Sequence, residues 1–285
     1  INQLSNLLNT FQSAIAGAER VFEIMDESPD MQDKENALDI KSFKGDVQFS
    51  HVNFSYEKEA SILKDITFQV KAGEKVALVG PTGSGKTTII NLLMRFYDID
   101  SGSIQIDGVN IQNYKISQLR EKIGIVLQDT FLFSGTIMEN IRYGRLNASD
   151  EEVVAAAKMA SAHSFIKHLP DQYETIITSG GSSLSQGQRQ LLAIARVILA
   201  DSDILILDEA TSSIDTKTEI EIQRGLNRLS EGRTSFVIAH RLKTIENADR
   251  ILVIHHGTLI ESGTHQELLQ KKGFYSDLYE SQFNI

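Results

Sequence analysis

The sequence predicts an α/β fold built around a mainly parallel β-sheet. Three apolar runs near the C-terminus are separated by stretches with helical periodicity: "ILILDEA" from Ile204, "TSFVIAH" from Thr234 and "RILVIHHGTLI" from Arg250. Such runs are typical of buried parallel strands with crossover helices. A further run, "KVALV" from Lys75, leads into a glycine-rich loop and then a helical stretch. This order of strand, loop and helix is the context that a phosphate-binding loop requires.

The composition is ordinary for a globular protein and excludes several classes of function. Of the 285 residues, 41% are hydrophobic and 23% are charged, as in soluble domains generally. The net charge of −10 provides no general basic surface, so we expect no nucleic-acid partner. Because the chain lacks cysteine, disulfides, thiolate nucleophiles and cysteine-ligated zinc are excluded.

The chain shows no targeting or membrane-spanning segment of its own. No run approaches the roughly 20 apolar residues that a spanning helix requires, and the start does not resemble a signal peptide. We therefore expect the chain as given to be soluble. It begins with Ile1 rather than Met, which fits a piece cut from a longer protein.

The N-terminal region predicts one long amphipathic helix. Its apolar residues recur at steps of three and four positions, namely Leu4, Leu7, Leu8, Phe11, Ile15, Ala18, Phe22 and Met25. Ser28-Pro29 ends this helix, and an acidic stretch follows it. We expect residues 1–28 to belong to an upstream domain, residues 29–44 to form a linker and residues 45–285 to form the main domain.

The main domain begins with strands and continues with helices. Alternating apolar residues from Val47 to Phe54 predict one strand, and "ITFQVKAGEKVALVG" predicts two more, joined at Ala72-Gly73. From about residue 129 to residue 200 the pattern is mostly helical, most clearly at 151–161 and 191–199.

The glycine-rich loop matches the motif G-x-x-x-x-G-K-[ST]. Its glycines allow backbone N–H groups to face a phosphate, and the following helix N-terminus adds positive potential. Lys86 supplies a charge to the β- and γ-phosphates, and Thr87 offers its hydroxyl to Mg²⁺. The predicted nucleoside triphosphate site contains Gly80, Pro81, Thr82, Gly83, Ser84, Gly85, Lys86, Thr87 and Thr88.

Polar residues at the ends of other strands complete this site. Asp208 and Glu209 follow a buried strand at the edge where α/β sheets bind ligands. Alone they would more often be a solvated strand end, but beside the loop Asp208 is expected to hold Mg²⁺ and Glu209 to act as base for the attacking water. Gln128 could orient that water or contact the metal, and His240 closes a strand of the same sheet. The other six histidines show no metal-ligand spacing.

With these residues in order, the chain resembles the nucleotide-binding domain of ABC transporters. "LSQGQ", which is Leu184, Ser185, Gln186, Gly187 and Gln188, is similar to the signature sequence of that family. The resemblance extends from about Gly45 to the C-terminus. It implies a P-loop NTPase core of RecA-like type, an N-terminal antiparallel β subdomain, and a helical subdomain at about 129–200 that carries the signature.

The resemblance also implies roles for individual residues. Tyr56, which alone would more often be a strand-end aromatic covering core, stacks on adenine. Gln128 is the Q-loop glutamine and a Mg²⁺ ligand, Ser212 to Asp215 form the D-loop, and His240 contacts the γ-phosphate. The signature acts in trans, on ATP bound to a second nucleotide-binding domain.

The N-terminal helix is similar to the end of the last transmembrane helix of fused exporters, through "AERVFEIMDE" from Ala18. This implies a membrane domain upstream in the full-length chain and a place at the cytoplasmic face of the cell membrane. Two positions depart from the family pattern: Gln186 stands where glycine is most common, and Ser179 stands where many exporters carry glutamate. Similar divergence occurs in heterodimeric exporters, so a homodimer and a heterodimer both stay open.

These features favour ATP hydrolysis that drives export, with ATP and Mg²⁺ as ligands. A soluble ABC ATPase of DNA repair or translation would instead show coiled-coil insertions, two cassettes or basic patches. An ATP-sensing module without turnover would be favoured by loss of Lys86 or Glu209, and both are present. A kinase would share the loop but would not explain Leu184 to Gln188. The transported substrate stays open.

Overall fold

The computed structural model describes residues 2–57, 60–127, 130–181, 183–209, 215–239 and 245–283. Gln128, Ser212 and His240, each predicted to act in the site, lie outside these ranges. The chain divides into two compact units, Ile1–Gln32 and Asp33–Ile285.

The first unit contains a single helix, α1, at Asn2–Met25. It ends before Ser28-Pro29, as the periodicity predicts. Its apolar side chains are exposed within the unit, among them Leu7 at 69% and Phe11 at 63%. Within the part of the chain that the structure describes, no helix combines the length and the apolar character needed to cross a membrane.

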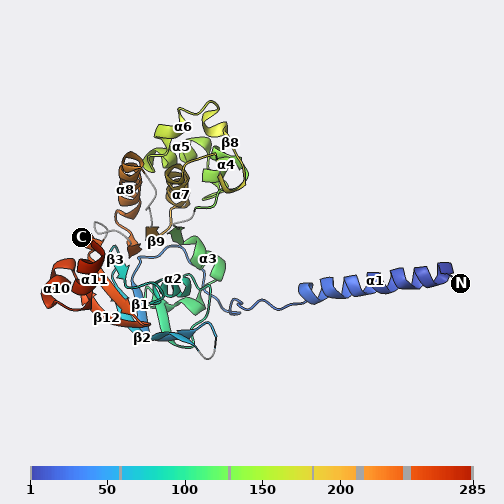
Figure 1. The fold of residues 1–285 in the computed structure, drawn as a ribbon, viewed down its shortest axis with the longest axis horizontal. Helices are drawn as coiled ribbons and strands as arrows, with labels where there is room; N and C mark the ends of the chain where they lie inside the picture. The colour runs from blue at the N-terminus through green and yellow to red at the C-terminus, as the bar shows by residue number, and fades with distance from the viewer. Residues whose placement is uncertain are drawn as a thin grey trace. The chain divides into compact units, whose positions relative to one another are not determined.

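Two β-sheets form the centre of the second unit (Figure 1). The antiparallel sheet has the order β2-β1-β4-β5, with bounds β1 Val47–Ser55, β2 Ser61–Val70, β4 Ser101–Ile106 and β5 Val109–Asn110. The central sheet has the order β12-β11-β3-β10-β9-β6, with bounds β3 Lys75–Val79, β6 Ile123–Val126, β9 Ile204–Glu209, β10 Thr234–Ala239, β11 Arg250–His255 and β12 Thr258–Gly263.

The central sheet is parallel except at one edge, where β12 runs antiparallel to β11. The run from Arg250 is therefore a hairpin rather than one parallel strand. His256 and Gly257 both have positive φ, 47° and 78°, which is the geometry of a two-residue hairpin turn. The predicted fold class, with its mainly parallel sheet and separate antiparallel sheet, is confirmed.

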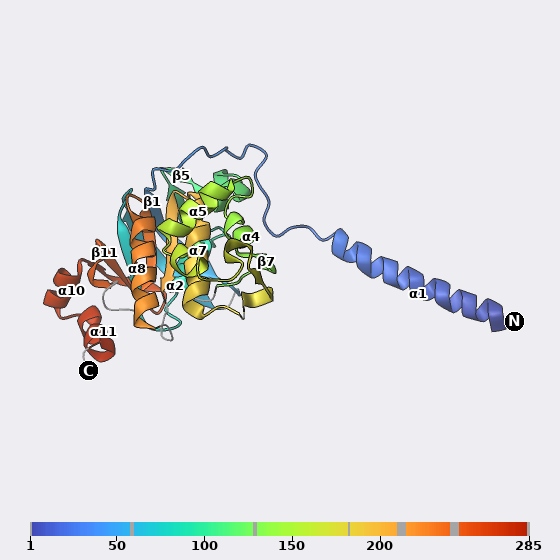
Figure 2. The ribbon, with the colours of Figure 1, turned by 90° about the horizontal axis from the view of Figure 1, so that it is seen from above.

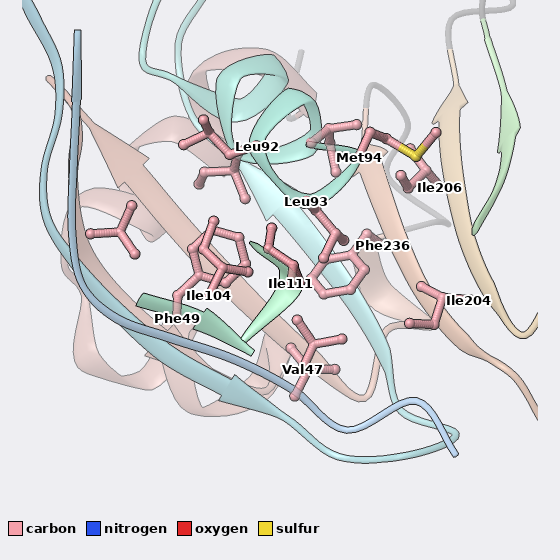
Figure 3. Close-up of a cluster of buried hydrophobic side chains, with 14 of the residues drawn as sticks. Val47, Phe49, Leu92, Leu93, Met94, Ile104, Ile111, Ile204, Ile206 and Phe236 are labelled. Atoms are coloured by element: carbon pink, nitrogen blue, oxygen red, sulfur yellow. The ribbon is translucent and has the colours of Figure 1, made fainter. Parts of the chain in front are cut away.

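The main core lies between the two sheets and encloses helix α2, Lys86–Leu93 (Figure 3). Phe49 of β1 stacks on Phe68 of β2 with ring centroids 4.6 Å apart, and Phe236 of β10 is fully buried. Burying one such side chain stabilises the fold by roughly 1.5–3 kcal/mol. This core holds α2 against β3. Lys86, Thr87 and Thr88 of the predicted phosphate site lie in the first turn of α2.

The opposite face of the central sheet is covered by helices, as the view from above shows (Figure 2). Leu205, Leu207 and Val237 point into this second core. Its helices are α4 Ile137–Arg142, α5 Asp150–Met159, α6 His163–Ile166, α7 Gln186–Ala200 and α8 Thr216–Ser230. The short strands β7 Gly135–Thr136 and β8 Ile176–Ile177 pair antiparallel beside them.

Shorter helices complete the second unit. The 3₁₀ turns are η1 Ile111–Asn113, η2 Gln172–Glu174 and η3 Ser179–Gly181. Three further helices are α3 Ile116–Glu121, α10 His265–Lys271 and α11 Phe274–Phe283. A third, smaller core joins Leu268 and Tyr275 of α10 and α11 to Val253 of β11.

Most of the segment predicted as a linker belongs to the second unit, and part of it packs there. Leu38 forms a bridge with Tyr114, and the Phe43 N–H donates to Asp203 Oδ2 at 2.8 Å. Asp107 accepts hydrogen bonds from the N–H groups of residues 44, 45 and 46. The backbone N–H groups of residues 43–46 are thus held by side chains far away in sequence.

Candidate active site

The loop between β3 and α2 has a backbone shape that requires glycine. Gly85 precedes α2 with φ 107° and ψ 5°, a conformation that L-residues rarely adopt. A Cβ built on Gly85 would lie 2.6 Å from Leu63 Cδ2, and one on Gly80 would overlap the Ile254 carbonyl oxygen. The loop therefore has no room for side chains at these positions, and its backbone can approach a ligand closely.

Lys86 closes this loop from the first turn of α2. Its ammonium donates to Gly80 O at 2.7 Å and Pro81 O at 2.9 Å. Burial lowers the pKa of Lys86, and the carboxylate of Asp208 acts in the opposite direction. A partly desolvated cation that donates to neutral carbonyls favours an anion beside it. The geometry therefore suits a phosphate group.

A cleft of about 370 Å³ opens at this loop, within the range of small-molecule sites. It lies where β3, β9 and β10 end, which is the edge at which parallel sheets bind ligands. Its lining brings together the loop, α2 and the end of β9: Tyr56, Ile62, Thr82, Gly83, Gly85, Lys86, Thr87, Thr88, Asp208 and Ile238.

Thr87 and Asp208 are the oxygen donors in this lining that suit a divalent cation. Mg²⁺ is usually held by one or two protein oxygens together with substrate phosphates and water. Among the described residues no group of three His, Cys, Asp or Glu side chains could hold a metal ion. The donor set fits Mg²⁺ bound with a nucleotide.

Tyr56 stands at the edge of the cleft with 46% of its surface exposed. Its hydroxyl accepts a hydrogen bond from Asn91 Nδ2 at 3.2 Å and lies 3.4 Å from Thr88 Oγ1. The rings of Phe54 and Tyr97 pack nearly perpendicular to its ring, at centroid distances of 4.8 and 5.0 Å. The ring is thereby oriented by α2, the helix that carries Lys86.

Asn91 and Tyr97 contact Tyr56 but are not among the site residues predicted from the sequence. Asn91 lies three positions after Thr88, so the two share one face of α2, and this spacing was the available signal. Tyr97 had no such signal, because its contact with Tyr56 depends on the tertiary fold.

Ser185 begins α7 through a capping box. Its Oγ accepts from Gln188 N at 3.2 Å, and Gln188 Oε1 accepts from Ser185 N at 3.0 Å. Leu184 is buried and anchors the turn, while Ser185 is exposed. The pentapeptide Leu184 to Gln188 is therefore a helix N-terminus in its own right, and α7 begins five residues before the predicted helical segment at 191.

None of residues 184–188 lines the cleft at Lys86, in the part of the chain that the structure describes. The chain thus carries two separate features that favour anions: a loop with a lysine and the exposed N-terminus of a 15-residue helix.

Comparison with known proteins decides the family. The ABC transporter family model matches residues 63–212, which is more than half of the chain. The chain belongs to the ABC transporter family. The matched range includes the phosphate-binding loop, the Leu184 to Gln188 pentapeptide and the acidic pair at the end of β9. The predicted nucleotide-binding ATPase domain is therefore confirmed.

Three similar proteins illustrate this ABC family membership. An uncharacterized ABC transporter ATP-binding protein, YfiC of Bacillus subtilis, is 57% identical over 99% of this chain and 47% of its own length. A fatty acid ABC transporter ATP-binding/permease protein of Mycobacterium bovis is 49% identical over 96% of this chain and 43% of its own length. The solved structure of a bacterial Atm1-family ABC exporter with ATP bound matches with a TM-score of 0.90 and 41% identity, over 96% of this chain and 48% of that one.

The chain spans about half the length of the curated ABC relatives that it matches. The alignments cover nearly all of this chain, so the resemblance is not confined to the ATPase motifs.

The remaining predicted site residues of the ABC domain differ in how far the structure describes them. The backbone of Glu209 ends β9, and its register partner on β10 is Ala239. Asp215 caps α8, where its Oδ1 accepts from Thr218 N at 3.0 Å. Hydrogen bonds from Thr218 lower the pKa of Asp215, so this carboxylate is ionised at neutral pH. The predicted roles of these residues stay predictions.

Proposed function

We propose that this chain binds and hydrolyses ATP to drive export of a substrate across the cell membrane. Two such domains meet head to tail with ATP between them, and hydrolysis releases them. The proposal places the domain at the cytoplasmic face of the membrane, joined to a membrane domain upstream in the same protein. Its partner is a second nucleotide-binding domain, either a copy of this chain or a related one.

The separation of the two anion-binding features carries this proposal. Lys86 lies in the cleft, whereas Ser185 begins a helix whose N-terminus lies outside it. A helix N-terminus favours an anion by roughly 0.3–1 kcal/mol, so the second feature is available to a nucleotide held by another domain. ATP that contacts both domains binds the closed pair more tightly than the open pair and shifts the population toward it.

The similar proteins support the proposed membrane domain and the proposed direction of transport. The mycobacterial relative is named as an ATP-binding/permease protein, and the matched structure is that of an exporter. By analogy, we assign to this chain a permease domain outside its own 285 residues and an outward direction of transport. Substrate choice would then depend on the permease domain.

In this mechanism the adenine stacks on Tyr56 and the phosphates lie on the backbone N–H groups of the loop. Lys86 exchanges the carbonyls of Gly80 and Pro81 for the β- and γ-phosphates, which satisfies a partly buried cation with an anion. The N–H groups at the start of α2 add positive potential at the same place.

Residues from several segments would act on the γ-phosphate and the metal, among them Asp208 and Glu209 at the end of β9. Thr87, Asp208 and Gln128 would hold Mg²⁺, which when bound offsets the charge of the phosphate oxygens. Glu209 orients the attacking water and accepts its proton. His240 is assigned a contact with the γ-phosphate.

The substitution Glu209→Gln tests this assignment. The amide keeps the shape of the side chain but cannot accept the proton, so we expect hydrolysis to fall by about 10²–10⁴-fold. ATP binding, measured by equilibrium dialysis, should persist. Lys86→Ala should instead lose ATP binding, and Glu231→Gln, in an exposed position after α8, should behave as the wild type. Hydrolysis close to the wild-type rate in Glu209→Gln would reject Glu209 as the base.

A further inference from the structure

Residues 131–136 form a short segment, here called the bridging segment. It contacts residues before the signature and residues of the helix that follows it. It begins two residues after Gln128-Asp129, which lie outside the described ranges, and ends at the start of α4. The two helices that flank it, α4 and α7, lie side by side (Figure 2). Its exposed aromatic residues, Phe131 and Phe133, are 57% and 42% exposed.

Arg196 joins the bridging segment to the signature helix α7. Its Nη1 donates to Phe131 O at 2.7 Å, and its Nε donates to Asn140 O at 2.6 Å. The guanidinium also lies over the rings of Phe133 and Tyr143, with centroids at 5.5 and 5.9 Å. Burial lowers the pKa of Arg196, as expected for a cation whose partners are mainly carbonyls and ring faces. One side chain thus fixes two backbone segments to α7.

Asn140 fixes the same segment from α4. Its Nδ2 donates to Phe133 O at 3.0 Å and Thr136 O at 2.9 Å, and its Oδ1 accepts from Phe133 N at 2.9 Å. The same Oδ1 accepts from Arg196 Nη2 at 2.5 Å. With 2% of its surface exposed, Asn140 uses its full amide capacity. The two side chains therefore form one connected polar network.

The bridging segment also contacts the residues that lead into the signature. Leu132 O accepts from Gly180 N at 3.0 Å, and β7 pairs with β8 through Gly135 and Ile177. Within α7, Arg189 Nη1 donates to Leu184 O at 2.7 Å. Leu184 is the residue that precedes Ser185. A displacement of the bridging segment would thus act on Ser185 from its lead-in and from its helix at once.

We propose that Arg196 and Asn140 are positioning residues for the signature, which make the bridging segment and α7 move as one body. When the bridging segment moves, these two residues would carry the movement to the N-terminus of α7. The position of Ser185 relative to a partner's nucleotide would then depend on the position of the bridging segment. This inference rests on the proposed function, because it needs a nucleotide site completed by two domains. It assigns no direct contact with nucleotide to either residue.

The arrangement requires arginine at position 196. The planar guanidinium donates in several directions and stacks on aromatic faces, whereas an ammonium is a compact point charge. Lysine at 196 could retain one of the carbonyl contacts but not the simultaneous contact with Phe131, Asn140 and the two rings. Arg196→Lys should therefore give a partial effect and Arg196→Met a full one.

Mixed dimers with a single working site test this assignment. One chain, the binding chain, carries Ser185→Arg and keeps its own ATP loop; the other, the signature chain, carries Lys86→Ala and keeps its signature. Only the ATP site of the binding chain, completed by the signature chain, can then work. Arg196→Met or Arg196→Lys is placed in either chain, and hydrolysis by purified pairs with distinct affinity tags is measured. Arg228→Met, on α8 with a hydrogen bond to Met159 O, serves as the matched control.

We expect Arg196→Met in the signature chain to lower hydrolysis by about tenfold or more, and the same change in the binding chain to lower it by less than about threefold. Arg228→Met should leave the rate of hydrolysis unchanged in either chain. Equal losses from both placements would show a general packing role and overturn the proposal, as would full activity in both. Should Arg196→Met fail to fold, the same comparison with Arg196→Lys decides in the same way. A parent pair without hydrolysis, before any change at 196, would instead contradict the proposed function.

Discussion

The Ser185 hydroxyl has a role in stability and a proposed role in hydrolysis, and two substitutions separate them. Ser185→Ala and Ser185→Gly both remove Oγ, which accepts the hydrogen bond of Gln188 N. Both keep the backbone N–H that donates to Gln188 Oε1. The cap uses a lone pair of the hydroxyl, so the proton remains able to donate to a phosphate oxygen.

The stability effects of the two substitutions should differ. Replacing an N-cap serine by alanine costs about 1 kcal/mol, whereas glycine costs only a few tenths. For a unit as large as Asp33–Ile285, about 1 kcal/mol corresponds to roughly 2–4 °C in Tm. Ser185→Ala should therefore lower Tm by about 2–4 °C and Ser185→Gly by about 1 °C or less, as measured by differential scanning calorimetry.

The hydrolysis effects should instead be equal. A hydrogen bond to a charged group contributes about 1.5–3 kcal/mol, which is roughly a 10–150-fold change in rate at about 1.4 kcal/mol per tenfold. Both variants should lose activity in this range while their ATP affinity stays near that of the wild type. Wild-type hydrolysis in Ser185→Gly, or losses that follow the order of the Tm values, would refute the proposed phosphate contact.

Two further predictions concern the phosphate-binding loop. Burial lowers the pKa of Lys86 in the free protein, and bound phosphates raise it, so ATP affinity should fall as the pH rises through the lowered pKa of the free protein. Lys86→Arg should flatten this dependence when ATP is titrated at a series of pH values, and an unchanged slope would reject Lys86 as its source. Gly85→Ala combines a positive φ of 107° with a Cβ placed 2.6 Å from Leu63 Cδ2, whereas Gly83→Ala has a φ of 79° and nothing within 4 Å. Urea denaturation should show a loss of roughly 2–5 kcal/mol for Gly85→Ala and about 1–2 kcal/mol for Gly83→Ala, and equal losses would contradict the packing argument.

Local sequence was sufficient where spacing along the chain determines the structure. The apolar runs at Ile204 and Thr234 form strands buried on both faces, which explains why a continuous apolar pattern predicted them. The phosphate-binding loop was predictable because its glycines, Lys86 and Thr87 lie within eight consecutive positions of the chain. Sequence reasoning failed at His256-Gly257, although this pair is a turn signal that splits the last apolar run into a hairpin.

Contacts between distant segments were outside the reach of local patterns. The residues before β1 read as a linker because they are polar, yet Asp107 and Asp203 bind their backbone. The orientation of Tyr56 by Asn91 and Tyr97, and the network of Arg196 and Asn140, likewise depend on packing between elements. The early start of α7 was visible in principle, since Ser185 and Gln188 have capping-box spacing.

The central claim is that ATP joins two of these domains through Lys86 of one and Ser185 of the other. Analytical ultracentrifugation of the Glu209→Gln chain tests it most directly, because a bound nucleotide would not be hydrolysed during the measurement. The account predicts that the chain is monomeric without ATP, that Mg²⁺ and ATP convert it to a dimer, and that adding Ser185→Arg abolishes this dimer while ATP binding persists. An ATP-dependent dimer that Ser185→Arg leaves intact would contradict the account, and a chain that binds ATP yet stays monomeric would exclude a copy of this chain as the partner.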